Sequence, residues 1–401
     1  MKIFFLLIIG GYAFINAWIL WWVWRALAGT GALRLCVFFV ILIWSLCFPL
    51  LYKSPGNSWP EIALFRAGAF WLGIFIYVFA LALLADAYGL AGKFLGLASA
   101  NRPRLQTCLF VIGLPFLIGC AGWLNAAFPV VKKYELAVRV DRPIPESDKG
   151  LTIAAISDLH LGKTITAARL ERAVNLLLPH KPDVVFFLGD MLDDHIRLDI
   201  EGLRTALSPL RPRLGLWGIA GNHEYHAGDD IDKSLAVLEQ IGLNMLRDEW
   251  RVLDGGLLLV GRDDPAGERL NGRKRKSLDD ILRTVPDVFR DFPLIVLDHQ
   301  PNDLGAAQKA GAALQLSGHT HYGQIWPFNL VVDRLFENAR GRSRRGETHY
   351  LVSVGTGTWG PPIRNTARPE VLLARIRFLQ RDGPETGHSQ SALPPGHTLA
   401  D

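Results

Sequence analysis

Four long apolar runs without a charged residue occupy the first third of the chain, and they constrain its fold more than any other feature. The runs are Ile3–Trp24, Leu35–Tyr52, Ala67–Ala85 and Leu105–Val131. Each is long enough to cross a hydrocarbon core of about 30 Å as a helix. Tryptophan and tyrosine cluster near their ends, as they do at membrane interfaces. The sequence therefore predicts a four-span transmembrane region over residues 1–131.

The first run lacks the A-x-A cleavage site of a signal peptide, and four such runs in succession do not fit a single leader. Four spans put the N-terminus and everything after residue 131 on the same side of the membrane. Basic residues flank the two faces in equal numbers, so the positive-inside rule does not choose that side. We expect a multi-pass protein of the cell (inner) membrane, with the side of the following domain left open.

The remaining composition excludes some classes of protein. All the cysteines lie inside the apolar runs, at Cys36, Cys47, Cys108 and Cys120. No cysteine follows residue 131, so that part of the sequence has neither a disulfide framework nor a cysteine-rich structural zinc motif. The net charge of +5 over 401 residues gives no case for a nucleic-acid partner.

Residues 132–378 have a different pattern, in which short apolar runs alternate with charged stretches of helical spacing. The predicted strands are "LTIAAIS", "DVVFFLG", "GLWGIAG", "GLLLVG", "FPLIVLD", "ALQLSG" and "YLVSVG". Several are apolar throughout, which is typical of strands covered on both faces. With the predicted helices "TAARLERAVNLLLPH" and "DKSLAVLEQIG" between them, they indicate one layered α/β domain. Residues 379–401, rich in Gly, Pro, Ser and Thr, predict a disordered tail.

Side chains that can bind metal ions follow five of the predicted strands. They occur in "DLH" (158–160), "GDMLD" (189–193), "GNHE" (221–224), at His299 and in "GHTH" (318–321). One such residue after a strand is usually a turn former or a structural residue. Five sets in order, at the strand ends where α/β sheets place their sites, indicate a metal centre. Two divalent ions can hold a phosphoryl group and activate a water, and a carboxylate with two oxygens can reach both ions.

These five blocks resemble the calcineurin-like metallophosphoesterase superfamily, whose pattern is D-x-H, GD-x-x-D, GNH-D/E, a later His and GH-x-H. "SGHTHYGQI" and "GTGTWGPPIRNTARPE" (355–370) are similar to stretches of its membrane-associated branch, which includes YkuE-like proteins and the transmembrane protein with metallophosphoesterase domain. Tyr322 stands where a second glycine is expected after GHTH. The resemblance covers residues 132–378 and implies a four-layer α/β/β/α sandwich.

The resemblance also implies roles for nine residues, seven as metal ligands and two in catalysis. The first ion would be bound by Asp158, His160 and His321, the second by Asn222, His299 and His319, with Asp190 bridging the two. His223 would stabilise the transition state or protonate the leaving oxygen. Asp193 would orient His223. These donors suit Mn, Fe or Zn.

Together these features predict a membrane-anchored, metal-dependent hydrolase of a phosphoric ester or pyrophosphate. The tether favours a lipid-linked substrate, and the resemblance makes a UDP-2,3-diacylglucosamine-type pyrophosphate one candidate. A water-soluble phosphodiester or a phosphoprotein stays open as the substrate. The alternative function is a catalytically silent membrane sensor or transporter with a metal-binding domain. Intact metal-binding blocks and few ionisable residues within the spans argue against it.

Other features leave alternatives open. His226 and Arg364 either meet the substrate or are surface or structural residues. The basic runs "GRKRK" (272–276) and "RGRSRR" (340–345) are either solvated loops or contacts to anionic headgroups. The stretch "NLVVDRLFENA" (329–339) follows the site and mixes apolar with charged positions, so it is a candidate for a lip that dips into the membrane.

Overall fold

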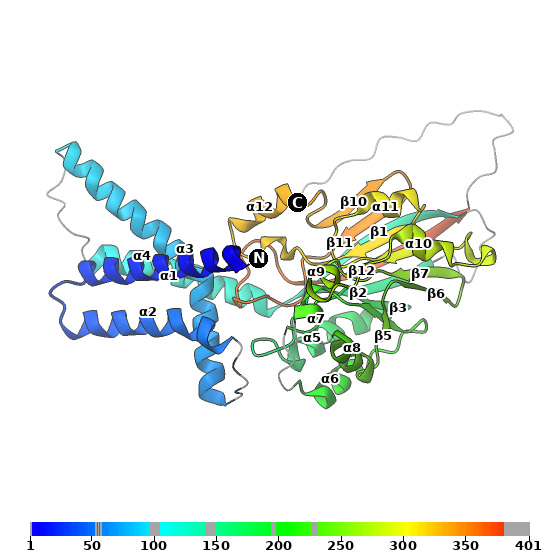
Figure 1. Cartoon of the computed structure of the whole chain (residues 1–401), viewed down its shortest axis with the longest axis horizontal. Coiled ribbons are helices and arrows are strands. Elements are labelled where there is room, and N and C mark those ends of the chain that lie inside the picture. Colours follow the sequence, from blue (N-terminus) through cyan, green and yellow to red (C-terminus); the bar gives the residue numbers. More distant parts are fainter. Residues whose placement is uncertain are drawn as a thin grey trace.

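The computed structural model describes residues 2–52, 54, 56, 58–96, 105–140, 150–193, 198–226 and 231–380. The chain consists of a group of long helices followed by a layered domain with two sheets (Figure 1). Of the predicted disordered tail, residues 381–401 lie outside the described residues, whereas 379 and 380 belong to the last strand.

Four apolar helices form the N-terminal part: α1 (Lys2–Ala26), α2 (Ala32–Leu51), α3 (Trp59–Phe94) and α4 (Leu105–Ala127). By length and composition each can cross a membrane, in agreement with the four predicted spans. Polar groups inside a membrane must be satisfied within the protein. The buried indole of Trp71 accordingly donates to Asn16 Oδ1 at 2.7 Å.

Two of these helices differ in length from the predicted runs. α4 ends at Ala127 instead of continuing to Val131, because Pro129 disfavours helical backbone at the residue before it. α3 has 36 residues, which at about 1.5 Å per residue is roughly 54 Å, more than a hydrocarbon core needs. The beginning of α3 lies against the domain, where Glu61 pairs with Lys163 at 3.4 Å.

Two six-stranded sheets form the domain. The first sheet contains, in spatial order, β1 (Val130–Val140), β12 (Glu370–Gln380), β2 (Gly150–Ile156), β3 (Val184–Phe187), β4 (Leu216–Ile219) and β5 (Asn244–Leu246). The second contains β10 (Gly341–Arg345), β11 (Thr348–Val352), β9 (Leu314–Ser317), β8 (Leu294–Leu297), β7 (Leu257–Gly261) and β6 (Glu249–Leu253). All seven predicted strands are present; β1, β5, β6, β10 and β12 are additional.

The sheets pack face to face, with helices on both outer sides. One apolar cluster joins the inner faces, for example Ile153 and Phe186 with Leu259 and Leu316. The outer face of the first sheet is covered by α5 (Ala167–Leu177), α6 (Ile200–Leu207) and α8 (Ile231–Gln240). The outer face of the second is covered by α10 (Leu278–Arg283) and α11 (Leu304–Lys309). The predicted α/β/β/α sandwich is confirmed, and its fully covered strands explain the continuous apolar runs.

The helices and the domain share an apolar contact. Ile325 and Ile363 belong to the domain, yet they are buried in the cluster formed by α1, α2, α3 and α4. Arg169 of α5 donates to the carbonyl of Ala126 at the end of α4. β1 begins at Val130, which lies inside the predicted transmembrane region 1–131. The division of the chain into a membrane part and a domain at residue 131 stays a prediction.

Candidate metal centre and active site

The predicted site residues follow strands of both sheets. They lie after β2, β3 and β4 of the first sheet and after β8 and β9 of the second: Asp158, His160, Asp190, Asp193, Asn222, His223, His299, His319 and His321. Backbone hydrogen bonds join these segments, since the amide of Asp158 donates to Gly189 O at 3.1 Å and that of Gly318 to His299 O at 2.9 Å. The short helix α7 (Asn222–His226) lies at the end of the domain nearest the long helices (Figure 1).

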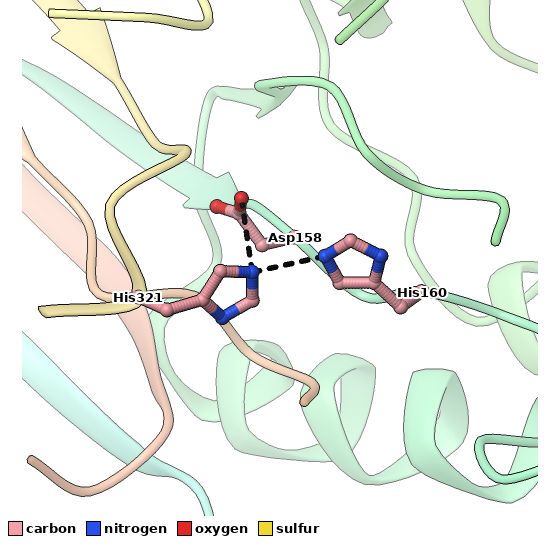
Figure 2. Close-up of side chains that lie close together, drawn as sticks. All are labelled: Asp158, His160 and His321. Atoms are coloured by element: carbon pink, nitrogen blue, oxygen red, sulfur yellow. Dashed lines mark hydrogen bonds and ion pairs between the residues drawn. The ribbon is translucent and has the colours of Figure 1, made fainter. Parts of the chain in front are cut away.

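Asp158, His160 and His321 converge as the first group of potential ligands (Figure 2). His321 Nε2 lies 2.9 Å from His160 Nε2 and 3.6 Å from Asp158 Oδ1. All three side chains are buried. Two imidazole nitrogens and a carboxylate oxygen that face one another in this way are donors that Mn, Fe or Zn accept.

Asp190, His299 and His319 form the second group. His299 Nε2 lies 3.1 Å from Asp190 Oδ2, while its Nδ1 donates to the carbonyl of Leu188 at 2.6 Å and fixes the ring. The Oδ1 atom of Asn222 is buried without a hydrogen-bond partner among the described residues. A buried amide oxygen without a partner is unfavourable, and a metal ion would satisfy it. The donors of this group therefore fit a second ion.

Asp190 connects the two groups through one of its oxygens. Oδ2 lies 3.1 Å from His299 Nε2 and 4.0 Å from His160 Nε2. Oδ1 instead accepts the backbone N–H of His223 at 2.8 Å. A bridging carboxylate is expected to reach the two ions with its two oxygens, whereas here Oδ2 faces both histidines and Oδ1 fixes the next loop.

His223 lies beside both groups and is oriented by a carboxylate. Its Nδ1 is 2.8 Å from Asp193 Oδ1, and its ring stands edge-on to His160 at 4.5 Å between centroids. Asp193 also lies 3.5 Å from His160 Nδ1. The paired Nδ1 leaves Nε2 of His223 as the ring nitrogen available to a substrate, which is the geometry required for its predicted role.

Burial and neighbouring charges give the histidines of the site different pKa values. Burial alone would lower the pKa of His223, but Asp190 and Asp193 outweigh it and raise that pKa to about 9. Burial and the neighbouring His299 lower the pKa of His319 to about 3. Burial and His160 likewise hold the pKa of His321 well below its ordinary value. In the metal-free protein His223 is therefore charged at neutral pH, while His319 and His321 have neutral imidazoles, the form that metal ions bind.

Glu224 has no role in the sequence analysis, although it ends the "GNHE" block. Its buried carboxylate accepts four backbone N–H groups at 2.7–3.0 Å, from Asp190, Met191, Leu192 and Gly221. It therefore ties the loop after β3 to the loop after β4. An acidic residue inside a block otherwise made of site residues is the signal that points to it.

Arg364 is a structural residue, not a contact for an anionic substrate. It is fully buried and donates to His321 Nδ1 at 2.8 Å and to Gly357 O at 2.9 Å. Its backbone is held by α4, because its N–H donates to Gly122 O at 3.0 Å and its carbonyl accepts from Asn125 Nδ2 at 2.9 Å. A membrane helix thus supports a residue that contacts a predicted ligand.

Tyr322 is buried between the metal-ligand loop and α12. Its hydroxyl donates to Asp333 at 3.1 Å, and the guanidinium of Arg340 lies 3.8 Å from its ring centroid. Asp333 belongs to α12 (Phe328–Leu335), so Tyr322 fixes that helix to the domain. His226, by contrast, is exposed, and its ring lies 6.1 Å from that of His223.

Several arginines of the two basic runs are bound within the protein. Arg273 lies 3.4 Å from Asp263, and Arg275 pairs with the buried Asp298. Arg342 donates to the carbonyl of Glu135 at 3.1 Å, and Arg344 to Glu347 at 3.0 Å. These contacts hold parts of both runs to the domain, an arrangement that neither alternative includes.

The loops that present the ligands have unusual backbone conformations. Five predicted ligands have φ between 46° and 72°: Asp158, His160, Asp190, His319 and His321. Such values are uncommon for residues other than glycine and concentrate at functional sites. Glycine is also needed beside them: a Cβ on Gly318 would lie 1.8 Å from Ser157 Oγ, and one on Gly221 would lie 2.2 Å from Asp190 Oδ1. The glycines of "GHTH" and "GNH" are therefore required by close packing.

Comparisons with known proteins find a family and several relatives that this chain resembles. The calcineurin-like phosphoesterase family matches residues 151–323. An uncharacterized metallophosphoesterase of Aquifex aeolicus is 32% identical over 263 residues, which cover 65% of this chain and 97% of that protein. The transmembrane protein with metallophosphoesterase domain of Danio rerio is 31% identical over 286 residues, or 68% of this chain and 63% of that protein. The chain thus spans just under two thirds of this vertebrate relative.

Among solved structures, the 5'-nucleotidase precursor of Thermus thermophilus is similar with a TM-score of 0.35 at 15% identity, over 56% of this chain and 54% of that one. That likeness is too distant to carry an argument. The family match and the Aquifex aeolicus relative are sufficient, and they confirm the resemblance on which the site prediction rests. The chain belongs to the calcineurin-like metallophosphoesterases, a family of phosphoric ester hydrolases that depend on two metal ions.

Proposed function

We propose that this protein is a membrane-anchored two-metal phosphoesterase that hydrolyses a phosphate ester or pyrophosphate of a lipid-linked substrate. The observation that carries the proposal is the Asp190 carboxylate. One of its oxygens lies within 4.0 Å of a histidine from each donor group. Two groups of ligands joined by one carboxylate are what a dinuclear centre requires.

In this proposal Asp158, His160 and His321 would hold the first ion, Asn222, His299 and His319 would hold the second, and Asp190 would contribute to both. Two bound ions supply charge stabilisation on the phosphoryl oxygens and a water of lowered pKa. His223, whose Nδ1 lies 2.8 Å from Asp193 Oδ1, would donate its Nε2 proton to the leaving oxygen. Asp193 holds the ring in the orientation that this transfer needs.

The position of the site supports a substrate in the bilayer. Ile325 follows His321 by four residues, and Ile363 directly precedes Arg364. Both isoleucines are buried among the membrane helices. A phosphoester at headgroup level would therefore be close to the metal centre. We extend the proposal to a UDP-2,3-diacylglucosamine-type pyrophosphate as the specific candidate. We also extend it to the cell (inner) membrane as the location, and to residues 1–131 and 132–378 as the anchoring and catalytic parts.

The test uses the full chain in lipid nanodiscs, with Mn²⁺ added or with a chelator. The substrates are an aryl phosphodiester, an aryl phosphomonoester and a UDP-linked diacyl sugar. We expect metal-dependent hydrolysis, with the lipid-linked substrate preferred over both aryl esters. Asp190→Asn is the matched control, because it keeps the shape of the side chain and removes the charge of the bridge. It should abolish hydrolysis and release both ions.

Hydrolysis that survives the chelator or the Asp190→Asn substitution would contradict the two-metal proposal. A preference for the aryl esters would contradict only the lipid-linked substrate. If the folded protein binds two ions and hydrolyses no member of the panel, the result would favour the alternative of a silent membrane sensor or transporter.

A further inference from the structure

Helix α12 and the turn before it expose an unusual amount of apolar surface. None of the eight residues of α12, all of which the structure describes, is buried. The exposed apolar side chains are Trp326, Phe328, Leu330, Val331 and Leu335, with Leu335 71% and Trp326 56% accessible. Contiguous apolar surface of this kind is rare on a soluble face and marks a place that is covered by another surface.

The other side of α12 is fixed to the domain. Val332 and Phe336 pack on Tyr322, and the Tyr322 hydroxyl binds Asp333 at 3.1 Å. The helix is therefore held in one orientation, with its apolar side chains directed away from the domain.

The position of α12 shows what covers that apolar surface. Along the long axis of the molecule, α12 lies at the level of the domain-side end of α1 (Figure 1). The chain entering it is bound to the membrane helices, because Ile325 is buried among them and Tyr77 of α3 donates to Trp326 O. The apolar surface is thus continuous with helices that can span a bilayer.

We infer that α12 and Trp326 lie in the interface of the same bilayer that α1–α4 span, with Phe328, Val331 and Leu335 directed toward the acyl chains. Short amphipathic helices bind at this depth through one apolar face. Tryptophan prefers the same layer, and Trp359, also exposed, provides a second one close by. The proposed occupant of the surface is lipid, not a second copy of the chain or another protein.

With α12 at the bilayer surface, the metal centre would open toward the membrane. This inference about substrate access rests on the proposed function. Phe336 follows α12 and its ring lies 5.8 Å from that of His319. Trp359 lies 5.7 Å from the ring of His223. Aromatic side chains at the bilayer surface therefore flank the residues proposed to act on the phosphoryl group. A phospholipid-like ester would reach them without leaving the membrane.

Photo-crosslinking in nanodiscs tests the position of α12 without requiring catalysis. Benzoylphenylalanine is placed at Val331, at Val288 and at Phe14, each in the full chain. Val288 is an exposed valine beyond α10, on the domain, and Phe14 is an exposed residue of α1. After irradiation, mass spectrometry should find lipid adducts at positions 331 and 14 and none at 288. An adduct at 14 with none at 331, or a protein adduct at 331 in place of lipid, would overturn the inference.

A second measurement tests access of substrate. The double variant Val331→Ser, Leu335→Ser should raise KM several-fold for a UDP-linked diacyl sugar in vesicles and leave hydrolysis of a soluble aryl phosphodiester unchanged. Val288→Ser is the control and should change neither value. Equal losses on both substrates, or no change on either, would overturn the access step. A lipid adduct at position 331 in a protein that hydrolyses nothing would refute the proposed function and leave the bilayer contact standing.

Discussion

The two halves of the metal centre rest on different parts of the molecule. In the part of the chain that the structure describes, the supports of Asp190 and His299 in the proposed second half come from the domain. The carbonyl of Leu188 fixes His299 at 2.6 Å, and the carboxylate of Glu224 accepts N–H groups from both loops around Asp190. These supports are a backbone carbonyl and a buried side chain from the loops that follow β3 and β4 of the first sheet.

The first half has a support that comes from the membrane region. Arg364 contacts His321 at 2.8 Å, and α4 holds the backbone of Arg364 at Gly122 and Asn125. Ligand orientation usually depends on such outer contacts. The comparison indicates that a displacement of α4 would alter the first ion's site and spare the second. The helices thus take part in positioning the metal centre as well as in anchoring the chain.

The largest expected effect comes from the residue that stands beside both halves. His223 contacts Asp190 through its backbone and His160 through its ring. His223→Gln should lower kcat by about 10²–10⁴-fold, as expected for loss of a general acid, while two ions remain bound. Steady-state kinetics together with metal analysis measures the two quantities. Loss of ions in parallel with kcat would instead make His223 a ligand and remove it from the proposed catalytic role.

Arg364→Lys should affect the two halves unequally. Lysine keeps the charge but cannot maintain the two contacts to His321 and Gly357 together. Loss of an outer contact to a ligand typically weakens metal binding about 10–100-fold. We expect that loss at the first ion only, measured by Mn²⁺ titration with electron paramagnetic resonance, which distinguishes a coupled pair of ions from a single one. Equal weakening of both ions would mean that the halves are not independently supported.

A smaller change on α4 tests whether the membrane helix transmits this support. A Cβ on Gly122 would lie 2.5 Å from Ile363 Cγ2 and 3.3 Å from Arg364 O. Gly122→Ala should therefore displace the loop and weaken the first ion several-fold, less than Arg364→Lys does. Overpacking of this kind also destabilises a protein by about 1–3 kcal/mol.

Gly113→Ala is the matched control, because a Cβ there meets nothing within 4 Å and lies on the same helix. Thermal unfolding and Mn²⁺ binding are compared for the two variants. Unchanged binding of the first ion in Gly122→Ala would show that α4 anchors the domain without influencing the metal centre.

Much of the fold and site could be predicted because the signals are local. Strands such as "DVVFFLG" are covered on both faces, so their apolar runs are continuous, and the residues after them belong to loops at the strand ends. Once five such loops contain Asp, Asn or His, their convergence follows from the layout of the sheets. The four helices could be predicted for the same reason, since apolar length alone identifies them.

The supports of the site could not be predicted in this way, because they depend on contacts between distant segments. Nothing around Arg364 in the sequence indicates that its backbone binds α4, about 240 residues earlier. The strands β1 and β12 come from opposite ends of the domain and pair with each other in parallel. Their alternating patterns are visible in the sequence, but their partners are not. Tyr322 has a role only because α12 packs on it.

The smallest expected effect concerns the charge on His223 in the metal-free protein. Burial lowers the pKa of His223, but the charge of Asp190, the hydrogen bond that His223 donates to Asp193, and the charges of Asp193 and Glu224 together raise it to about 9. Asp193→Asn should therefore bring the pKa down part of the way toward the ordinary value of about 6.5, with Asp190 still raising it. Because the pKa in the folded protein is raised, His223 favours folding below about pH 6.5, and this contribution is lost as pH rises through about 9. In Asp193→Asn the contribution of His223 to folding should therefore be lost at a lower pH than in the unchanged protein.

Nuclear magnetic resonance titration of labelled histidines in the chelated protein measures the shift of the His223 pKa. An unchanged pKa would leave Asp193 as a support of His160 alone, and the orientation of His223 would then depend on the second half of the centre through Asp190.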